Sequence, residues 1–175
     1  EVGGFTQVNA KLNNLMVKRA MDLLQPSPGE RIADLFCGLG NFTLPIARSG
    51  AQVLGVEGLP DLVNRAKQNA VVNDCQGYVD FRVADLFKVN PSAWDDWCNM
   101  DKVLLDPPRT GAHAVIEMLT QARRLQRIVY VSCNPATFVR DAVLLVQKGY
   151  RFRSLGVVNL FSQTAHIESI GCYDR

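Results

Sequence analysis

The segment "IVYVSCNPATFVRD" (128–141) places Cys133 where an apolar, strand-like run gives way to a helix start. Asn134 and Pro135 are typical of the first positions of a helix. A thiol there could pack, bind a metal, form a disulfide or act as a nucleophile. Because the free N–H groups and the dipole of a helix start favour a thiolate, we predict that Cys133 is a nucleophile. The remaining cysteines are predicted to be structural: Cys37, Cys75, Cys98 and Cys172.

The five cysteines are widely spaced, and the sequence has no C-x-x-C pair. Only two histidines, His113 and His166, could complete a metal site. This pattern is unfavourable for zinc, so we predict no metal site. Reduced thiols in a cytoplasmic protein are the expected state.

A base is offered by "LFSQTAHIES" (160–169), where His166 and Glu168 are two residues apart on a predicted strand. Side chains with this spacing lie on one face of a strand. Glu168 has apolar neighbours, so we predict that it is either paired or a working base. For His166 a structural role is predicted.

Acidic residues follow successive predicted strands: Asp34, Glu57, Asp85 and Asp106. Gly38 and Gly40 form a turn after the first strand, but Thr43 stands where a dinucleotide fingerprint has its third glycine. A carboxylate in the position of Glu57 can accept both ribose hydroxyls, and Asp85 could bind an adenine amino group. The acids come without a lysine and would repel phosphate. They therefore favour a cationic, phosphate-free cofactor, S-adenosylmethionine, over NAD.

A thiolate beside a methyl donor indicates methylation of a pyrimidine at C5. Attack of the thiolate on C6 activates C5, which takes the methyl group before a base removes its proton. In "LLDPPRTG" (104–111), Arg109 stands where exocyclic-amine methyltransferases carry an aromatic residue, which disfavours amine methylation. Cytosine-5 enzymes usually place a cysteine after this proline turn. This chain has Pro108 and Arg109 there, so that alternative is also disfavoured.

These residues require a parallel sheet, because ligands in such folds lie at the carboxyl ends of the strands. The alternating patterns predict an α/β fold with seven strands, mostly parallel, with an antiparallel C-terminal pair and helices on both faces. A first helix is predicted from a cap at Asn9 and an apolar stripe of Leu12, Leu15, Met16, Ala20 and Leu23. Strands are predicted at 31–36, 52–57, 78–85, 101–106, 127–132, 150–160 and 166–173. The later helices are predicted at 41–50, 60–73, 112–121 and 135–147, with room for one short helix after 85.

The 175 residues, 47% hydrophobic and 21% charged, are sufficient for one domain. The apolar runs are shorter than the roughly 20 residues of a membrane span, so no membrane partner is expected. The net charge of +2 is too small to indicate a nucleic-acid partner, and the arginines around Arg124 and Arg153 are predicted to form solvated basic edges. The first residue is Glu1, which suggests a piece of a longer chain, and we expect a monomer.

Several motifs together resemble a known family: "FTQVNA", "DLFCGLGNFTL", "GVEG", "LLDPPRTGA", "VYVSCNPATFVRD" and "TAHIES". They resemble those of the S-adenosylmethionine-dependent RNA (uracil-5-)-methyltransferases, and most closely those of the members that act on 23S ribosomal RNA. The resemblance extends over essentially all 175 residues. It implies a Rossmann-like class I methyltransferase fold.

The resemblance also implies roles for individual residues. Cys133 would be the nucleophile and Glu168 the base that removes the C5 proton. Gln7 and Asp106 would face the target uridine, which the family turns out of its RNA fold. The cofactor site would consist of Gln7, Phe36, Gly38, Gly40, Asn41, Glu57, Asp85 and Asp106.

The resemblance is to the catalytic domain alone, over residues 1–175. Full-length members add an N-terminal RNA-binding TRAM domain and, in the 23S branch, a cysteine-ligated iron–sulfur cluster, neither of which is expected within these residues. Two alternatives remain open. One is a uracil-5 methyltransferase of transfer RNA; the other is a cofactor-binding module that is inactive on RNA without its missing part.

Overall fold

A single seven-stranded sheet forms the centre of the computed structural model, which describes residues 2–88, 97, 99–159 and 167–175. The strand order is β3-β2-β1-β4-β5-β7-β6. Strands β1 to β5 run parallel, and β7 pairs antiparallel with both β5 and β6. The strands are β1 (Arg31–Leu35), β2 (Gln52–Glu57), β3 (Val79–Val83), β4 (Lys102–Leu105), β5 (Arg127–Ser132), β6 (Arg151–Asn159) and β7 (Ile167–Asp174). This is the predicted mixed sheet with its antiparallel C-terminal pair.

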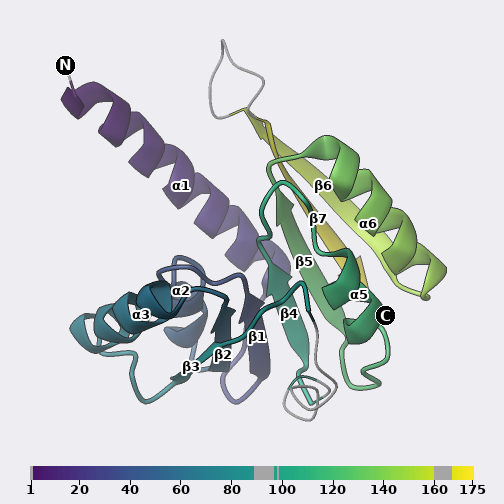
Figure 1. The fold of residues 1–175 in the computed structure, drawn as a ribbon, viewed down its shortest axis with the longest axis horizontal. Coiled ribbons are helices and arrows are strands. Elements are labelled where there is room, and N and C mark those ends of the chain that lie inside the picture. The colour runs from purple at the N-terminus through teal and green to yellow at the C-terminus, as the bar shows by residue number, and fades with distance from the viewer. Residues whose placement is uncertain (1, 89–96, 98, 160–166) are drawn as a thin grey trace.

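Helices cover both faces of the sheet, as Figure 1 shows. One face carries α1, α2 and α3, and the other carries α5 and α6. Their bounds are α1 (Val2–Leu24), α2 (Thr43–Ala47), α3 (Pro60–Val72), α5 (His113–Leu119) and α6 (Pro135–Gln147). The sheet therefore separates two apolar cores.

The central strands are apolar along almost their whole length because both of their faces are covered. In β1, β2, β4 and β5 nearly every residue after the first is buried. The edge strand β3 is mostly exposed, with Phe81 buried against Gly55 of β2. This rigid layer fixes the positions of the loops that leave its carboxyl edge.

The first helix differs from its prediction. It begins at Val2, so Asn9 lies inside it and does not cap it. Leu15 is 51% exposed, since the packed face is defined by Met16, Ala20 and Leu24 at four-residue spacing. Helix α2 is also much shorter than the predicted 41–50, because turns occupy both of its flanks.

The room for a short helix after 85 falls mostly on residues 89–96, which lie outside the described part of the chain. Within the described residues, the structure has no helix that is both long and apolar enough to cross a membrane. In the same part of the chain, no group of three or more histidine, cysteine, aspartate or glutamate side chains is arranged to hold a metal ion.

Candidate active site

Three strands bring the candidate chemical groups to the same edge of the sheet. Asp106 directly follows β4, and Cys133 directly follows the neighbouring strand β5. Glu168 lies near the start of β7, which runs antiparallel to β5 and pairs Ser169 with Ser132. The antiparallel direction of β7 is what returns Glu168 to the carboxyl end of β5.

Glu168 and Asp106 line one cavity of about 240 Å³. Its walls include Asn13 of α1 and Asn41 of the glycine turn, whose side-chain amides exchange two hydrogen bonds of 2.9 Å. Met16, Phe42 and Val131 supply apolar walls. Two carboxyl groups and two amide groups therefore line one small cavity.

Asp106 also borders a larger cavity of about 560 Å³, whose other polar residues are Glu57 and Asp85. The carboxylate of Glu57 accepts the N–H groups of Gly38 at 3.2 Å and Leu59 at 3.1 Å. These two bonds fix its orientation at the end of β2, and each oxygen retains a lone pair for a ligand. The ribose contact of Glu57 stays a prediction.

Phe36 forms the apolar wall of this cavity. Its φ of 66° turns the chain sharply after β1, and its ring lies 5.5 Å from that of Phe87. Asp85 lies two residues beyond the end of β3, where one carboxylate oxygen accepts the Phe87 N–H at 2.9 Å. Lys88 lies 3.9 Å from the other oxygen. Asp85 thus anchors the turn that presents Phe87.

The glycine turn borders a third cavity, of about 570 Å³, which Asp106 and Asn41 also line. Gly38 and Gly40 adopt φ values of 54° and 87°, a region that favours glycine. The predicted cofactor residues Phe36, Gly38, Gly40, Asn41, Glu57, Asp85 and Asp106 therefore surround connected hollows at one sheet edge.

Asp34 is placed differently from the acidic cradle that the sequence predicts. Its carboxyl is fully buried beneath the turn and accepts the Thr43 hydroxyl at 2.5 Å. Burial raises the pKa of Asp34 to about 7, and the Thr43 hydrogen bond opposes that rise. Thr43, which replaces the third glycine, is thus the partner of Asp34, a relationship that sequence analysis missed.

The electrostatics of the site are those of crowded acids. The pKa of Asp106 is raised to about 7, chiefly by burial and in addition by the charges of Asp34 and Glu168. The pKa of the Cys133 thiol is raised by burial and by Glu168, while Arg109 lowers it. The helix start therefore does not produce the lowered thiol pKa that the sequence predicts, because burial and the neighbouring carboxylate outweigh it.

Two residues predicted for the site lie wholly or partly outside the described part of the structure. Gln7 lies within α1, but its side chain is outside the described part of the structure, as is the whole of His166. Sequence analysis also missed Asn13. The sequence gives one signal for Asn13, which lies one helical turn after Asn9 and therefore on the same side of the helix. Its partner Asn41 is 28 residues away, and only the fold brings the two together.

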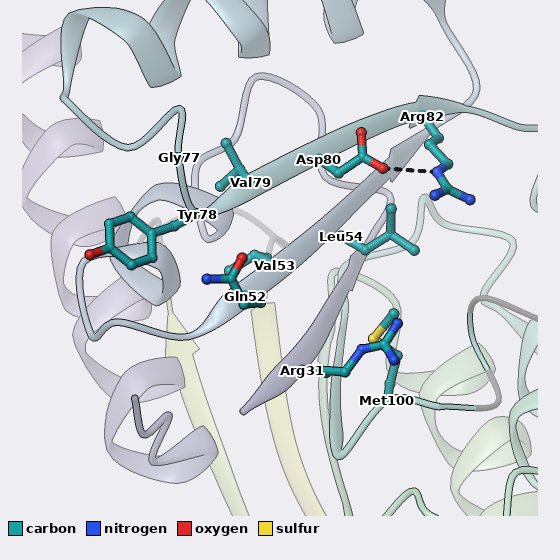
Figure 2. A pocket seen from close by; sticks show the side chains of 10 residues that line it. All are labelled: Arg31, Gln52, Val53, Leu54, Gly77, Tyr78, Val79, Asp80, Arg82 and Met100. Carbon is teal, nitrogen blue, oxygen red and sulfur yellow. Dashed lines mark hydrogen bonds and ion pairs between the residues drawn. The ribbon is translucent and has the colours of Figure 1, made fainter. Parts of the chain in front are cut away.

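Figure 2 shows a separate cavity of about 200 Å³, formed mainly where β1, β2 and β3 begin. Asp80 and Arg82 form an ion pair of 3.0 Å on its wall, and Arg31 lies on the side of Met100. None of the predicted site residues lines this cavity. The candidate chemistry is thus concentrated at the carboxyl edge, where parallel sheets bind ligands.

Comparison with solved structures defines the class of fold. The tRNA (uracil-54, C5)-methyltransferase of Pyrococcus abyssi, solved with S-adenosyl-L-homocysteine, is 30% identical, with a TM-score of 0.77 over 92% of this chain and 38% of that one. A precorrin-6y C5,15-methyltransferase of Geobacter metallireducens is 14% identical, with a TM-score of 0.74 over 91% of this chain and 88% of its own, a likeness of fold alone. The fold is that of the Rossmann-like S-adenosylmethionine-dependent methyltransferases.

Sequence comparison defines the family. The sequence model of the tRNA (Uracil-5-)-methyltransferase family matches residues 1–86 and 81–173, and this chain belongs to that family. Curated relatives include the 23S rRNA (uracil(1939)-C(5))-methyltransferases RlmD of Azoarcus sp. (strain BH72), 55% identical, and Acidithiobacillus ferrooxidans, 56% identical. Each match covers 98% of this chain. The chain spans about 40% of the length of the curated relatives it matches.

Proposed function

We propose that the protein to which this chain belongs transfers a methyl group from S-adenosylmethionine to C5 of a uridine in 23S ribosomal RNA. The observation that carries the proposal is the convergence of Cys133, Glu168 and Asp106 at one sheet edge, beside cavities lined by Glu57 and Asp85. Relatives 51–56% identical are named as 23S rRNA enzymes, which supports the choice of RNA.

The residues present suit S-adenosylmethionine. The pKa of Asp106 is raised to about 7, first by burial and then by repulsion from the charges of Asp34 and Glu168. A cationic molecule would relieve that repulsion. Glu57 would hold the ribose hydroxyls, Asp85 the adenine, Phe36 and Phe87 the apolar ring faces, and Gly38 and Gly40 the methionine portion. Gln7 and Asn41 complete the proposed set. When bound, the cofactor supplies the methyl group that C5 receives.

The chain's own residues perform the remaining steps. The Cys133 sulfur forms a bond to C6 of the uracil, which places the electron pair of the C5–C6 double bond at C5. After C5 has been methylated, Glu168 removes the C5 proton. That electron pair restores the double bond as the C6–S bond breaks and the thiolate leaves. Gln7 and Asp106 would hold the edge of the uracil while Cys133 adds to C6 and C5 receives the methyl group.

Transfer RNA is the second candidate substrate. The Pyrococcus abyssi structure, 30% identical to this chain, is of an enzyme whose substrate is transfer RNA. The same residues would perform the same chemistry, because the attacked atoms of uracil are identical. The choice between the two RNAs then depends on the remainder of the protein. A third reading makes this chain a cofactor-binding module that is inactive on RNA by itself.

Mass spectrometry of a trapped complex tests the chemistry. The full-length protein is incubated with S-adenosylmethionine and 23S ribosomal RNA that carries 5-fluorouridine, with fluorine-containing transfer RNA in a parallel arm. Fluorine at C5 cannot leave as a proton does, so the adduct persists. We expect an adduct on a peptide that contains Cys133, formed with ribosomal RNA and not with transfer RNA.

The controls are the Cys133→Ala and Cys133→Ser variants, which should bind S-adenosylmethionine normally and form no adduct. An adduct that forms only with transfer RNA would show that transfer RNA, and not ribosomal RNA, is the substrate. An adduct at another cysteine, or full turnover by Cys133→Ala, would refute the proposed mechanism.

A further inference from the structure

We propose that Asp141 is a positioning residue, which holds the loop that carries Asp106 in register with Cys133. The proposal rests on the function proposed above and concerns a residue with no place in its chemical steps. Asp141 lies on α6, the helix that begins directly after Cys133 and Asn134. The loop concerned runs from Asp106 at the end of β4 to Ala112 before α5.

The first two turns of α6 bind the backbone of this loop at successive residues. Asn134 Nδ2 and the Thr137 hydroxyl both donate to the carbonyl of Arg109, at 2.9 and 3.2 Å. Arg140 Nη2 donates to the carbonyl of residue 110 at 3.0 Å. The Ala112 N–H donates to Asp141 Oδ2 at 2.8 Å. We call these four contacts the α6 clamp.

Asp141 is the buried centre of the clamp. Asp141 is fully buried, and its carboxylate accepts hydrogen bonds from Ala112, Tyr130 and Arg140. These bonds offset the free-energy cost of burying a charge. The Tyr130 hydroxyl donates to Oδ2 at 2.8 Å, and Arg140 pairs with Oδ1 at 2.7 Å. Strand β5, helix α6 and the loop therefore meet at one carboxylate.

Gly111 shows how closely the loop approaches the clamp. Its φ is 78°, and a Cβ built on it would lie 2.5 Å from both Arg140 Nη2 and Asp141 Oδ2. Only glycine permits this approach. A residue with a side chain at position 111 could not approach Arg140 and Asp141 this closely.

The clamp connects the two sides of the site. Asn134 follows Cys133 in the chain and holds the carbonyl of Arg109, whose charge lowers the pKa of the Cys133 thiol. Pro107 and Pro108 have fixed φ angles, which leaves fewer backbone torsions between Arg109 and Asp106 to absorb a shift. A displacement of about 1 Å between reacting groups can cost a rate factor of about 100.

Asp141→Asn is the main variant for the test, in the full-length protein with S-adenosylmethionine and 23S ribosomal RNA. An asparagine keeps the shape but loses the charge, and its N–H₂ group must face either Arg140 or the Ala112 and Tyr130 donors. In either orientation one link between α6 and the loop is weakened. We expect kcat to fall about 100-fold, while KM for RNA and Kd for the cofactor change less than about threefold. Hydrogen exchange at the Ala112 amide should become faster.

Thr137 offers a milder pair in case Asp141→Asn fails to fold. Thr137→Val removes the hydroxyl that donates to the carbonyls of Arg109 and Asn134, whereas Thr137→Ser keeps it. Thr137 is only partly buried. We expect Thr137→Val to lower kcat about fivefold, the factor expected for one hydrogen bond. Thr137→Ser should retain wild-type kcat.

Wild-type kcat in a folded Asp141→Asn variant would overturn the proposal. So would a loss that appears only as weaker cofactor binding, or equal activity of Thr137→Val and Thr137→Ser. If the wild-type protein methylates no RNA, the proposed function fails separately. The clamp is then judged by hydrogen exchange at residues 109–112, which must be faster in Thr137→Val than in Thr137→Ser.

Discussion

At the scale of single residues, the site is defined by carboxyl groups that are buried and that raise one another's pKa. Asp34 and Asp106 both have a pKa raised to about 7, chiefly by burial. Glu168 raises the pKa of Asp106 and of Cys133 as well. A site of this kind attracts a cation and discourages a thiolate until the substrate is present.

The first prediction concerns the pH dependence of cofactor binding. Because the pKa of Asp106 is about 7, the carboxyl is mostly neutral at pH 5.5 and mostly charged at pH 8. A cation binds the charged form better, so affinity for S-adenosylmethionine should rise about tenfold over that range. Isothermal titration calorimetry measures it. Asp106→Asn should remove most of the rise, while Asp80→Asn at the opposite edge should keep it. A flat profile in the wild type would contradict the assignment.

The second prediction separates the two roles assigned to Cys133 and Glu168. Glu168→Gln removes a charge that raises the pKa of Cys133, so iodoacetamide should alkylate Cys133 faster at pH 8. The same variant should lose methyl turnover and accumulate the covalent RNA adduct, since the C5 proton has no acceptor. Peptide mass spectrometry follows both products. Asp85→Asn, which lies by the other cavity, is the control for alkylation and should match the wild type. If Glu168→Gln showed unchanged alkylation of Cys133 and normal methyl turnover, the role assigned to Glu168 would be refuted.

The sequence reveals residues of this site when they directly follow a strand. Asp106 and Cys133 could be predicted because the apolar runs before them have clear ends. It does not reveal pairs that meet only through the fold. Thr43 and Asp34 meet around a turn, and Asp141 reaches Ala112 across 29 residues. The raised pKa of Cys133 was likewise missed, since it depends on burial in the fold and on the charge of Glu168 from another strand.

At the scale of elements, the strands were predicted to within two residues at each end because alternation of apolar runs and turns marks them clearly. Strand β5 and helix α6 match their predicted bounds, since Asn134 caps the helix and Pro135 starts it. The start of α1 was wrong. A capping residue indicates a helix start only where the residues before it are not helical. Here the residues before Asn9 are already helical from Val2 onwards.

The third prediction tests the joint between β1 and α2. Thr43→Val leaves the buried Asp34 without its hydroxyl donor, whereas Thr43→Ser keeps that donor. Loss of a hydrogen bond to a charged, buried group costs about 1–3 kcal/mol of unfolding free energy. The Thr43 bond lowers the pKa of Asp34, so removing it should raise that pKa further.

The sign of the pH effect follows from this shift. A raised carboxyl pKa in the folded state means that stability falls as the pH rises from about 4 through 7. Thr43→Val should therefore be more harmful at pH 8 than at pH 5, as measured by thermal unfolding of the full-length protein. Equal losses at both pH values would show that Asp34 is not charged at pH 8. Equal losses in Thr43→Val and Thr43→Ser would point to packing instead.

At the scale of the whole molecule, three of the arginines that stand out in the sequence are paired with carboxylates. Arg124 pairs with Asp101 at 2.6 Å, and Asp174 accepts both Arg127 at 2.7 Å and Arg153 at 3.1 Å. Hydrogen bonds from Arg127 and Arg153 lower the pKa of Asp174, as expected for a tight cluster. These groups lie where β5 begins and β7 ends, opposite the edge that carries Cys133.

The fourth prediction follows from this distribution of charge. RNA that delivers a uridine to Cys133 must approach the carboxyl edge, where Arg109 is exposed. The affinity of the full-length protein for RNA should fall with salt, by a slope of about 0.7–0.9 for each phosphate contact. Arg109→Ala should reduce that slope by about one contact. The matched double variant Arg124→Ala and Arg153→Ala removes two charges from the opposite edge and should leave the slope unchanged. Filter binding between 50 and 200 mM salt resolves such a difference. A reduced slope in the double variant would mean that RNA also reaches the far edge, and that the ion pairs with Asp101 and Asp174 open to admit it.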